Sequence, residues 1–172
     1  MALADDILAD IDSNTLNDIA QQVGVEPDKL QGIIRDSLPA LLGGMEKNVQ
    51  SGEGAASLAN ALGQHADANP LGDMGSLITG VLGSGILEKV LGGAAPDVSE
   101  AIGKKAGASG VDVEKVLKIV APIVMAYLAK RLTSGGKADP TVVQQEVQNA
   151  STEAKAQSPD LGSILGSILG NR

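Results

Sequence analysis

One run of the chain restricts its fold more than any other: residues 111–132, VDVEKVLKIVAPIVMAYLAKRL. Between Ile119 and Ala129 this run carries no charge, and its only polar side chain is that of Tyr127. A helix that is apolar on almost every side has to be buried, and this one is shorter than the roughly 20 apolar residues that span a bilayer. The run therefore predicts the central buried helix of an all-α multi-helix bundle.

The rest of the core has to be aliphatic. The 172 residues include no Phe, no Trp and one Tyr, although 43% of them are hydrophobic. Leu, Ile, Val, Met and Ala must fill the interior, and 22 glycines allow backbones to approach closely. The aromatic residues that favour strands are missing, and no long alternating run is present, so a β fold is not expected.

Charge and cysteine content exclude several functional classes. The formal net charge of −8 disfavours binding to nucleic acid and to anionic membranes. The chain has no cysteine, which excludes disulfides, thiolate metal sites and cysteine nucleophiles. The first residues, MALADDILADID, have neither the basic stretch nor the long apolar stretch of a secretory signal. No transmembrane segment is predicted, and a cytoplasmic location is expected.

Periodicity and helix-ending residues predict helices along the rest of the chain. Between residues 30 and 45, apolar residues recur three and four apart and form one face of a helix. Pro27 can begin that helix, because its missing N–H is not needed there, and Gly24 ends the helix before it. Ser13 or Asn14 is expected to cap that earlier helix. The predicted helices span about 2–11, 14–23, 27–50, 55–62, 96–105, 111–132 and 140–155, two short helical pieces are expected within 71–91, and loops are expected at 51–54, 64–70 and 133–139.

The chain also contains the pattern of an internal duplication. Shifting the sequence by 83 residues aligns two copies without a gap, each reading as a short helix, a glycine turn and a long helix that contains a proline. The aligned pairs include Ile19 with Ile102, Gly24 with Gly107, Pro39 with Pro122 and Lys47 with Lys130. Residues 1–156 are therefore predicted to form one helical domain made of two related halves, about 1–85 and 86–156, followed by a glycine-rich apolar tail at 157–172.

The two long helices differ in their polar positions. Asp36, Ser37 and Gly44 of the first copy align with an isoleucine, a valine and a tyrosine of the second. These positions lie seven or eight residues apart, so they form a second stripe along the helix. The sequence therefore predicts that the first long helix buries one face and the second, residues 111–132, buries two.

Three glycine-rich apolar segments carry a resemblance to a known family. They are LPALLGGM at 38–45, PLGDMGSLITGVLGSG at 70–85 and LGSILGSILG at 161–170. Together they resemble a bacterial family of unknown function, the YidB-like proteins and their uncharacterised relatives, over most of the chain. The resemblance implies an all-α fold of about six or more helices, with internal duplication and one helix surrounded by the others. It implies no activity, so no catalytic residue is carried over.

The apolar tail is the strongest candidate for an interaction site. Glycine at every fourth position makes a groove along a helix in which another backbone can lie close. The large apolar side chains of the tail have to be covered, either by the protein's own core or by a partner. The candidate interaction residues are Gly162, Ile164, Leu165, Gly166, Ile168, Leu169 and Gly170.

Residues 15–35 carry an alternative, because their spacing fits a helix-turn-helix. Binding to DNA would require the second helix to offer polar and basic side chains, which here are Lys29, Gln31 and Arg35. Asp28 and Asp36 roughly cancel their charge, so the electrostatic contribution to DNA binding is missing. Packing of two helices explains the same spacing, and nucleic acid is not the expected partner.

No residues are predicted to bind a metal or cofactor or to catalyse a reaction. Asp10, Asp12 and Asn14 match the first positions of a calcium loop, but the later glycine and glutamate are missing, so N-capping is the preferred interpretation. His65, the only histidine, is expected to lie in a solvated loop without the partners that a zinc site or a catalytic triad needs.

The sequence thus predicts a non-enzymatic helical module that acts through protein–protein contacts. Its partner is either an unknown protein or a second copy of itself, so that a homo-oligomer is one expected outcome. The alternative is the DNA-binding module at residues 15–35. A third hypothesis, an enzyme or small-molecule carrier with an aliphatic cavity, has little support, because convergent polar groups are missing.

Overall fold

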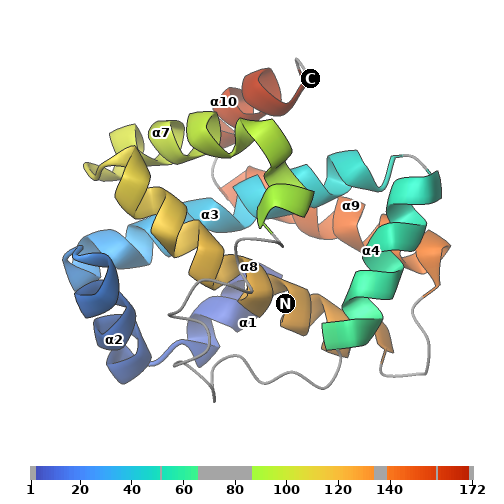
Figure 1. Cartoon of the computed structure of the whole chain (residues 1–172), viewed down its shortest axis with the longest axis horizontal. Coiled ribbons are helices and arrows are strands. Elements are labelled where there is room, and N and C mark those ends of the chain that lie inside the picture. The colour runs from blue at the N-terminus through green and yellow to red at the C-terminus, as the bar shows by residue number, and fades with distance from the viewer. Residues whose placement is uncertain (1–2, 51, 66–86, 134–138, 158, 171–172) are drawn as a thin grey trace.

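The computed structural model describes residues 3–50, 52–65, 87–133, 139–157 and 159–170. Every regular element within these ranges is a helix (Figure 1), which confirms the predicted all-α class for this part of the chain. Residues 87–91 form a helical turn that leads into a short 3-10 helix, η1 (Gly92–Ala94). The α-helices are α1 (Leu3–Asp10), α2 (Ser13–Val23), α3 (Pro27–Asn48), α4 (Gly52–His65), α7 (Ala95–Ala106), α8 (Gly110–Thr133), α9 (Pro140–Gln157) and α10 (Pro159–Gly170).

Helix boundaries agree with the sequence prediction at most positions and differ at a few. α4 begins at Gly52 and ends at His65, so the expected loops at 51–54 and 64–70 are wrong for residues 52–54 and 64–65. The N-cap of α2 is Asp12 rather than Ser13 or Asn14; its carboxylate accepts a hydrogen bond from the Thr15 amide at 2.8 Å. Thr133, expected in a loop, is the last residue of α8, and Asp139 directly precedes α9. The glycine-rich pieces at 71–86 and the loop residues 51, 66–70 and 134–138 lie outside the described ranges.

The two helix–turn–helix units α2–α3 and α7–α8 are connected by the same kind of turn. α2 ends at Gly24, with a φ of 83°, and α7 ends at Gly107, with a φ of 74°. This left-handed conformation suits glycine because a side chain would be strained there. The next amide then bonds back to the helix: Val25 N donates to the carbonyl of Ala20, as Ala108 N donates to that of Gly103. The donors, acceptors and capping glycines of the two units are each 83 residues apart.

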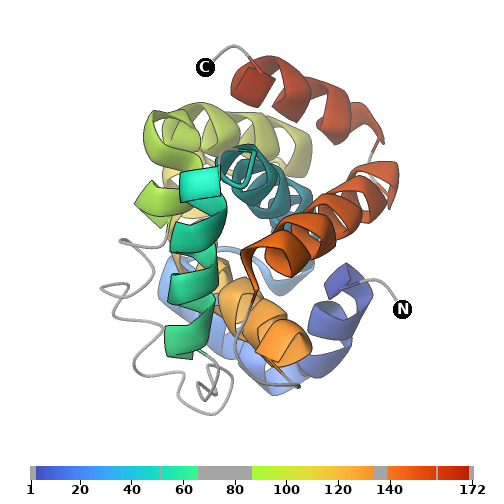
Figure 2. The ribbon, with the colours of Figure 1, turned by 90° about the vertical axis from the view of Figure 1, so that its right-hand side faces the viewer.

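α3 and α8 share the centre of the fold. Figure 2 shows the end of α3 in the middle of the molecule, with other helices around it. α3 packs against α1, α2, α4, α7, α8, α9 and α10, whereas α8 packs against α1, α2, α3, α4 and α7. Both helices contain a proline, Pro39 and Pro122, within a fully buried stretch. The centre is therefore occupied by two helices, rather than by residues 111–132 alone.

The prediction that α3 buries only one face is wrong. Every residue from Asp36 to Met45 is buried, including the polar ones. Ser37, 0% exposed, satisfies its hydroxyl by donating to the carbonyl of Ile33 one turn earlier, at 2.6 Å. The carboxylate of Asp36 accepts a hydrogen bond from Lys105 Nζ of α7 at 3.2 Å. Both side chains find partners inside the fold, and this lowers the cost of burying a polar group.

Gly44 allows another segment to lie directly on α3. A Cβ atom at this position would stand 2.6 Å from the carbonyl oxygen of Val90 and 2.9 Å from a methyl carbon of Leu91. The side-chain amide of Asn48, one turn further along α3, donates to the carbonyls of Lys89 and Val90 at 2.8 and 3.4 Å. The glycine thus provides the space, and the asparagine holds the last carbonyls of the 87–91 turn in place.

α1 packs into the core and is joined to α8 by a hydrogen bond. Ile7 is fully buried in the core. The hydroxyl of Tyr127 in α8 donates a hydrogen bond to the carboxylate of Asp10, at the end of α1. Burial, together with the negative charges of Asp10 and Asp6, raises the pKa of the Tyr127 phenol above its ordinary range. The phenol therefore stays a hydrogen-bond donor throughout the neutral range of pH.

Candidate interaction surface

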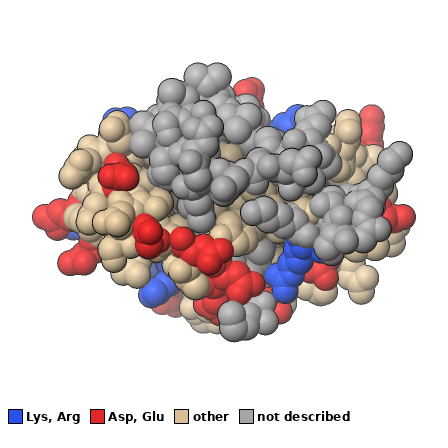
Figure 3. All heavy atoms as spheres, turned by 90° about the horizontal axis from the view of Figure 1, so that it is seen from below, with Lys and Arg blue, Asp and Glu red and all other residues tan. Residues whose placement is uncertain are grey.

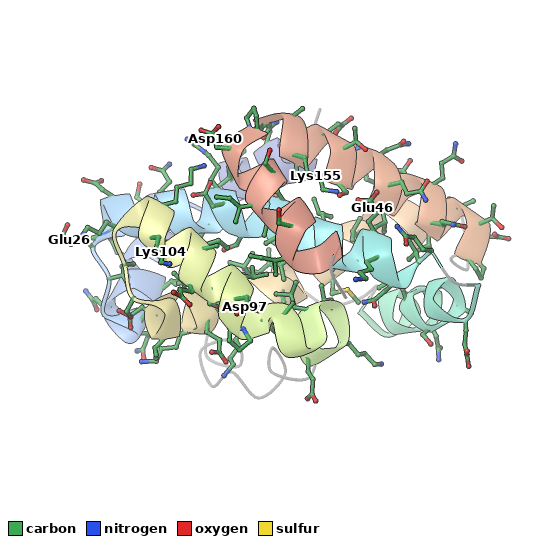
Figure 4. All side chains as sticks on the ribbon, turned by 90° about the horizontal axis from the view of Figure 1, so that it is seen from above. Glu26, Glu46, Asp97, Lys104, Lys155 and Asp160 are labelled. Carbon is green, nitrogen blue, oxygen red and sulfur yellow. The ribbon has the colours of Figure 1, made fainter. Side chains whose placement is uncertain are left out.

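The predicted interaction tail forms α10, which lies on the surface of the bundle. Figure 4 shows α10 crossing over α3 with α7 on one side and α9 on the other. Its packing partners in the structure are these three helices. Pro159 stands at the start of α10, where its missing N–H costs nothing, and Asp160 lies in the first turn, where the helix dipole favours a negative charge.

The inner side of α10 belongs to the protein's own core. Leu165 is 0% exposed, and Ile168 is partly buried against the same cluster. Gly162 faces α9, where an added Cβ would lie 3.5 Å from the Cβ of Lys155, an ordinary contact distance. Packing against its own core is therefore what covers the inner side of the tail in this structure.

The described residues on the outer side of α10 are small, except for one larger apolar side chain. Ser163, Gly166 and Ser167 are exposed, and nothing lies within 4 Å of a Cβ built on Gly166. Ile164 is 42% exposed. The glycine series therefore divides between two surroundings, because Gly162 faces α9 while Gly166 faces open space. The side chains of Leu169 and Gly170, also expected to interact, lie outside what the structure describes.

A polar cluster fastens α9 to α3 next to the start of α10. One carboxylate oxygen of Glu46 accepts from Ser151 Oγ at 2.6 Å and from Lys155 Nζ at 2.8 Å (Figure 4). Burial by itself would raise the pKa of the Glu46 carboxyl, but the bonds from Lys155 and Ser151 outweigh it and hold the pKa below its ordinary value. The cluster therefore joins α9 to α3 through an ion pair and a hydrogen bond.

This cluster has the residue types of a serine–lysine catalytic pair but not its arrangement. A nucleophilic serine needs a base within hydrogen-bond distance and access for a substrate. Ser151 is 0% exposed, and its hydroxyl donates to the carboxylate of Glu46 instead of to Lys155. The geometry therefore fits a structural role. Sequence analysis missed the cluster, because Glu46 lies more than 100 residues from its partners, and only the four-residue spacing of Ser151 and Lys155 pointed to a shared face.

The candidate DNA-contacting side chains are exposed but stand in acidic surroundings. Lys29, Gln31 and Arg35 are all exposed on α3. Seven of the 21 acidic residues precede Lys29, the first basic residue of the chain, so residues from 29 onward hold 14 acidic and 13 basic side chains. Figure 3 shows acidic side chains gathered on the described part of the lower face. A DNA backbone approaching the α2–α3 unit would meet the acidic residues along with the three candidates.

The proposed calcium-loop residues have other roles in the fold. Asp12 caps α2, and this bond to the Thr15 amide lowers the pKa of its carboxyl. Asp10 accepts a hydrogen bond from the hydroxyl of Tyr127, and Asn14 lies within α2. In the described ranges, no three His, Asp or Glu side chains gather as metal ligands. His65 is the last residue of α4 instead of lying in a loop, and its side chain is outside the described set.

Fold and surface define the class of this protein: an all-α bundle built around its two long helices, α3 and α8, with a surface helix at its C-terminal side. The chain belongs to a family of bacterial proteins of unknown function, DUF937, which matches residues 5–131. No curated protein and no solved structure matches it. The match confirms the resemblance to a bacterial family of unknown function, while the narrower YidB-like grouping stays a prediction.

α9 and α10 follow the matched residues along the chain. Of the helices that the structure describes, none is long and apolar enough to cross a membrane.

Proposed function

We propose that this protein is a non-enzymatic helical module for protein–protein contact, and that it associates with itself through α10. The observation that carries this proposal is how α10 is attached. Among its described side chains, at 159–160 and 162–168, none forms a hydrogen bond or an ion pair with another helix; the Ser167 hydroxyl donates to Ser163 O within α10, at 3.3 Å. The described side chains of α10 therefore attach it through apolar packing, and Leu165 is fully buried among them.

Such an attachment is weak enough to be reversible. Full burial of a leucine side chain stabilises by about 1.5–3 kcal/mol. α9, in contrast, is fastened to α3 through the Glu46 cluster as well as through apolar packing. α10 therefore lacks the polar attachment that α9 has, and its apolar inner side is typical of helices that dock into grooves.

The alternative function, DNA binding by residues 15–35, has a weaker basis. Lys29, Gln31 and Arg35 offer two positive charges next to Glu26 and Asp28, which are exposed on the same unit. Non-specific affinity for DNA depends on the number of phosphates that a protein neutralises. This surface neutralises few, so we do not adopt the alternative.

We also infer that the α2–α3 and α7–α8 units are two copies of one ancestral unit. Support comes from the 83-residue spacing that relates their capping glycines, their backbone bonds across the turn and their internal prolines. The copies have diverged most where their surroundings differ. Gly44 of α3 lies beneath Val90, whereas the equivalent Tyr127 of α8 reaches Asp10 of α1.

Light scattering coupled to size exclusion tests self-association directly. We expect the mass to rise above 17.3 kDa as protein concentration increases. A constant mass at every concentration would refute the proposal.

A matched pair of variants then locates the contact. Leu165 in α10 and Leu30 in α3 are both 0% exposed, so Leu165→Ala and Leu30→Ala remove the same buried group. Each substitution should lower the free energy of unfolding by at most about 2–5 kcal/mol. We expect only Leu165→Ala to speed the return of the mass to its equilibrium value after dilution, because α10 has to detach from its site before the association can change. An equal change in both variants would show that lost stability, and not α10, is responsible.

A further inference from the structure

We propose that self-association takes place by exchange of α10: the helix of one copy occupies the site over α3, between α7 and α9, of a second copy. This inference rests on the proposed function and deepens it, because it names the occupant and the site. The exchange would be mutual, so that two copies each give and receive one α10.

The first argument is that every copy contains both halves of the contact. The inner side of α10, with Leu165 and Ile168, already fits the surface formed by α3, α7 and α9. A second copy presents the same helix and the same site, so the intermolecular contact reproduces the intramolecular one. Exchange between two copies therefore requires no additional complementary surface.

The second argument is the length of the connection. Only residue 158 separates the end of α9 at Gln157 from the start of α10 at Pro159. Proline cannot continue the hydrogen bonding of the preceding helix, so the chain must break between the two helices. A short connection between two docked helices is the setting in which domain swapping occurs, because the exchanged helix keeps every one of its contacts.

The third argument is that the described side chains of α10 break no polar bond to the helices beneath them when α10 leaves. The Glu46 cluster, which lies next to Gly162, joins α9 to α3 and remains intact when α10 departs. The described side chains of α10 contribute apolar packing only. The body of the bundle can therefore keep its fold while the helix moves.

The outer side of α10 is the competing contact, and it is the poorer one. Among the described side chains it offers one large apolar group, Ile164, beside Ser163, Gly166 and Ser167. Stable interfaces need a buried apolar centre of several side chains. On the inner side, Leu165 is fully buried and Ile168 is partly buried against the core, and for this reason we assign the contact to exchange.

Disulfide trapping between two single-cysteine variants distinguishes the two contacts. The chain has no cysteine of its own. A Cβ at Gly162 would lie 3.5 Å from the Cβ of Lys155, within the usual range for a disulfide of about 3.5–4.5 Å. Lys155→Cys and Gly162→Cys are prepared as separate proteins, with a tag on one of them. Without exchange, neither protein brings two cysteines together; with exchange, Cys of one copy faces Cys of the other.

The variants are mixed at increasing concentration up to on the order of 1 mM, the effective concentration typical of a short linker. Oxidised glutathione serves as the oxidant and is reduced as the disulfide forms. We expect a covalent heterodimer that increases with concentration, with a single 155–162 crosslink in peptide mass mapping. Each variant alone should give several-fold less covalent dimer. Circular dichroism confirms that both variants are folded.

The outcomes separate this inference from the proposed function. Self-association of the wild type without a 155–162 crosslink overturns exchange and leaves the proposed function standing, with the outer side of α10 as the contact. Constant monomer mass overturns both.

A second variant keeps the inference testable if Lys155→Cys does not fold. Inserting six Gly and Ser residues between Gln157 and Pro159 lengthens the connection, so that α10 returns to its own site without a sharp reversal. We expect the dimer fraction to fall several-fold at a given concentration. An unchanged or larger dimer fraction contradicts the exchange.

Discussion

Two glycines of α3 provide a sharp test of the packing, because one substitution should have opposite effects at the two positions. Gly44 lies under the 87–91 turn, with the carbonyl oxygen of Val90 only 2.6 Å from the place of a Cβ. Gly32, about three turns earlier in the same helix, has nothing within 4 Å of that place. Gly32→Ala is therefore a matched control for Gly44→Ala.

The expected magnitudes follow from two effects. Alanine in a helix interior is favoured over glycine by about 0.8–1 kcal/mol, and this gain applies to both variants. At Gly44 the new methyl group also overpacks, at a typical cost of about 1–3 kcal/mol. We take the upper end, about 3 kcal/mol, because the atom in the way is backbone and Asn48 holds it. Gly44→Ala should then lose about 2 kcal/mol, while Gly32→Ala gains about 1.

Thermal and urea unfolding followed by far-ultraviolet circular dichroism measure both changes. For a chain of this length, 1 kcal/mol shifts Tm by about 2–4 °C. We therefore expect Tm to fall by about 4–8 °C in Gly44→Ala and to rise by about 2–4 °C in Gly32→Ala. A Gly44→Ala protein as stable as the wild type would show that the 87–91 turn does not lie directly on α3.

Two further predictions concern the turns and the polar cluster. Gly24→Ala and Gly107→Ala each force a side chain into a left-handed conformation, so each should lower the free energy of unfolding by about 1–2 kcal/mol. Similar urea midpoints of the two variants would support equivalence of the two units. A large difference between the midpoints would count against it. The pKa of Glu46 is lowered on folding, so its contribution to stability is present above the ordinary glutamate pKa, near 4.5, and is lost as pH falls below it. In urea titrations at each pH, Glu46→Gln should therefore lose less stability between pH 6 and about pH 3 than the wild type does. Equal losses in the two proteins would show that the Glu46 carboxylate does not cause the loss of stability at low pH.

Local patterns in the sequence were sufficient to place the helices. Gly24 and Gly107 were expected to end helices, and both adopt the left-handed cap, since few other residues reach that conformation without strain. The apolar run at 111–132 became α8 with boundaries one residue wider on each side. These features depend on neighbours within a few residues, so a single sequence contains the information.

Contacts between distant segments were not predictable in this way. Asp36 and Ser37 were interpreted as outward-facing because they are polar, yet Asp36 meets Lys105, 69 residues away, and Ser37 bonds to its own backbone. Gly44 was placed on the stripe that α3 was predicted to leave unburied, yet it is the site where Val90 approaches. A polar residue in a pattern indicates only that a partner is needed, and water and a distant side chain satisfy that need equally.

The candidate interaction surface was predicted in part for the same reason. The tail was identified from its apolar residues, but its division into an inner side at Leu165 and an outer side at Gly166 depends on how α10 lies on α3 and α7. The Glu46 cluster was missed entirely, because no local signal connects α3 with α9.

The hydrogen bond between Tyr127 and Asp10 gives the protein a built-in optical probe. With no Trp and no Phe in the chain, this phenol is the only aromatic chromophore, and it lies where α1 meets α8. The near-ultraviolet circular dichroism of the unmodified protein therefore reports on the contact between α1 and α8, whereas the far-ultraviolet signal reports on all the helices. If α1 detaches before the rest unfolds, the two transitions will have different midpoints, and the phenol will ionise at a lower alkaline pH once released from its acceptor.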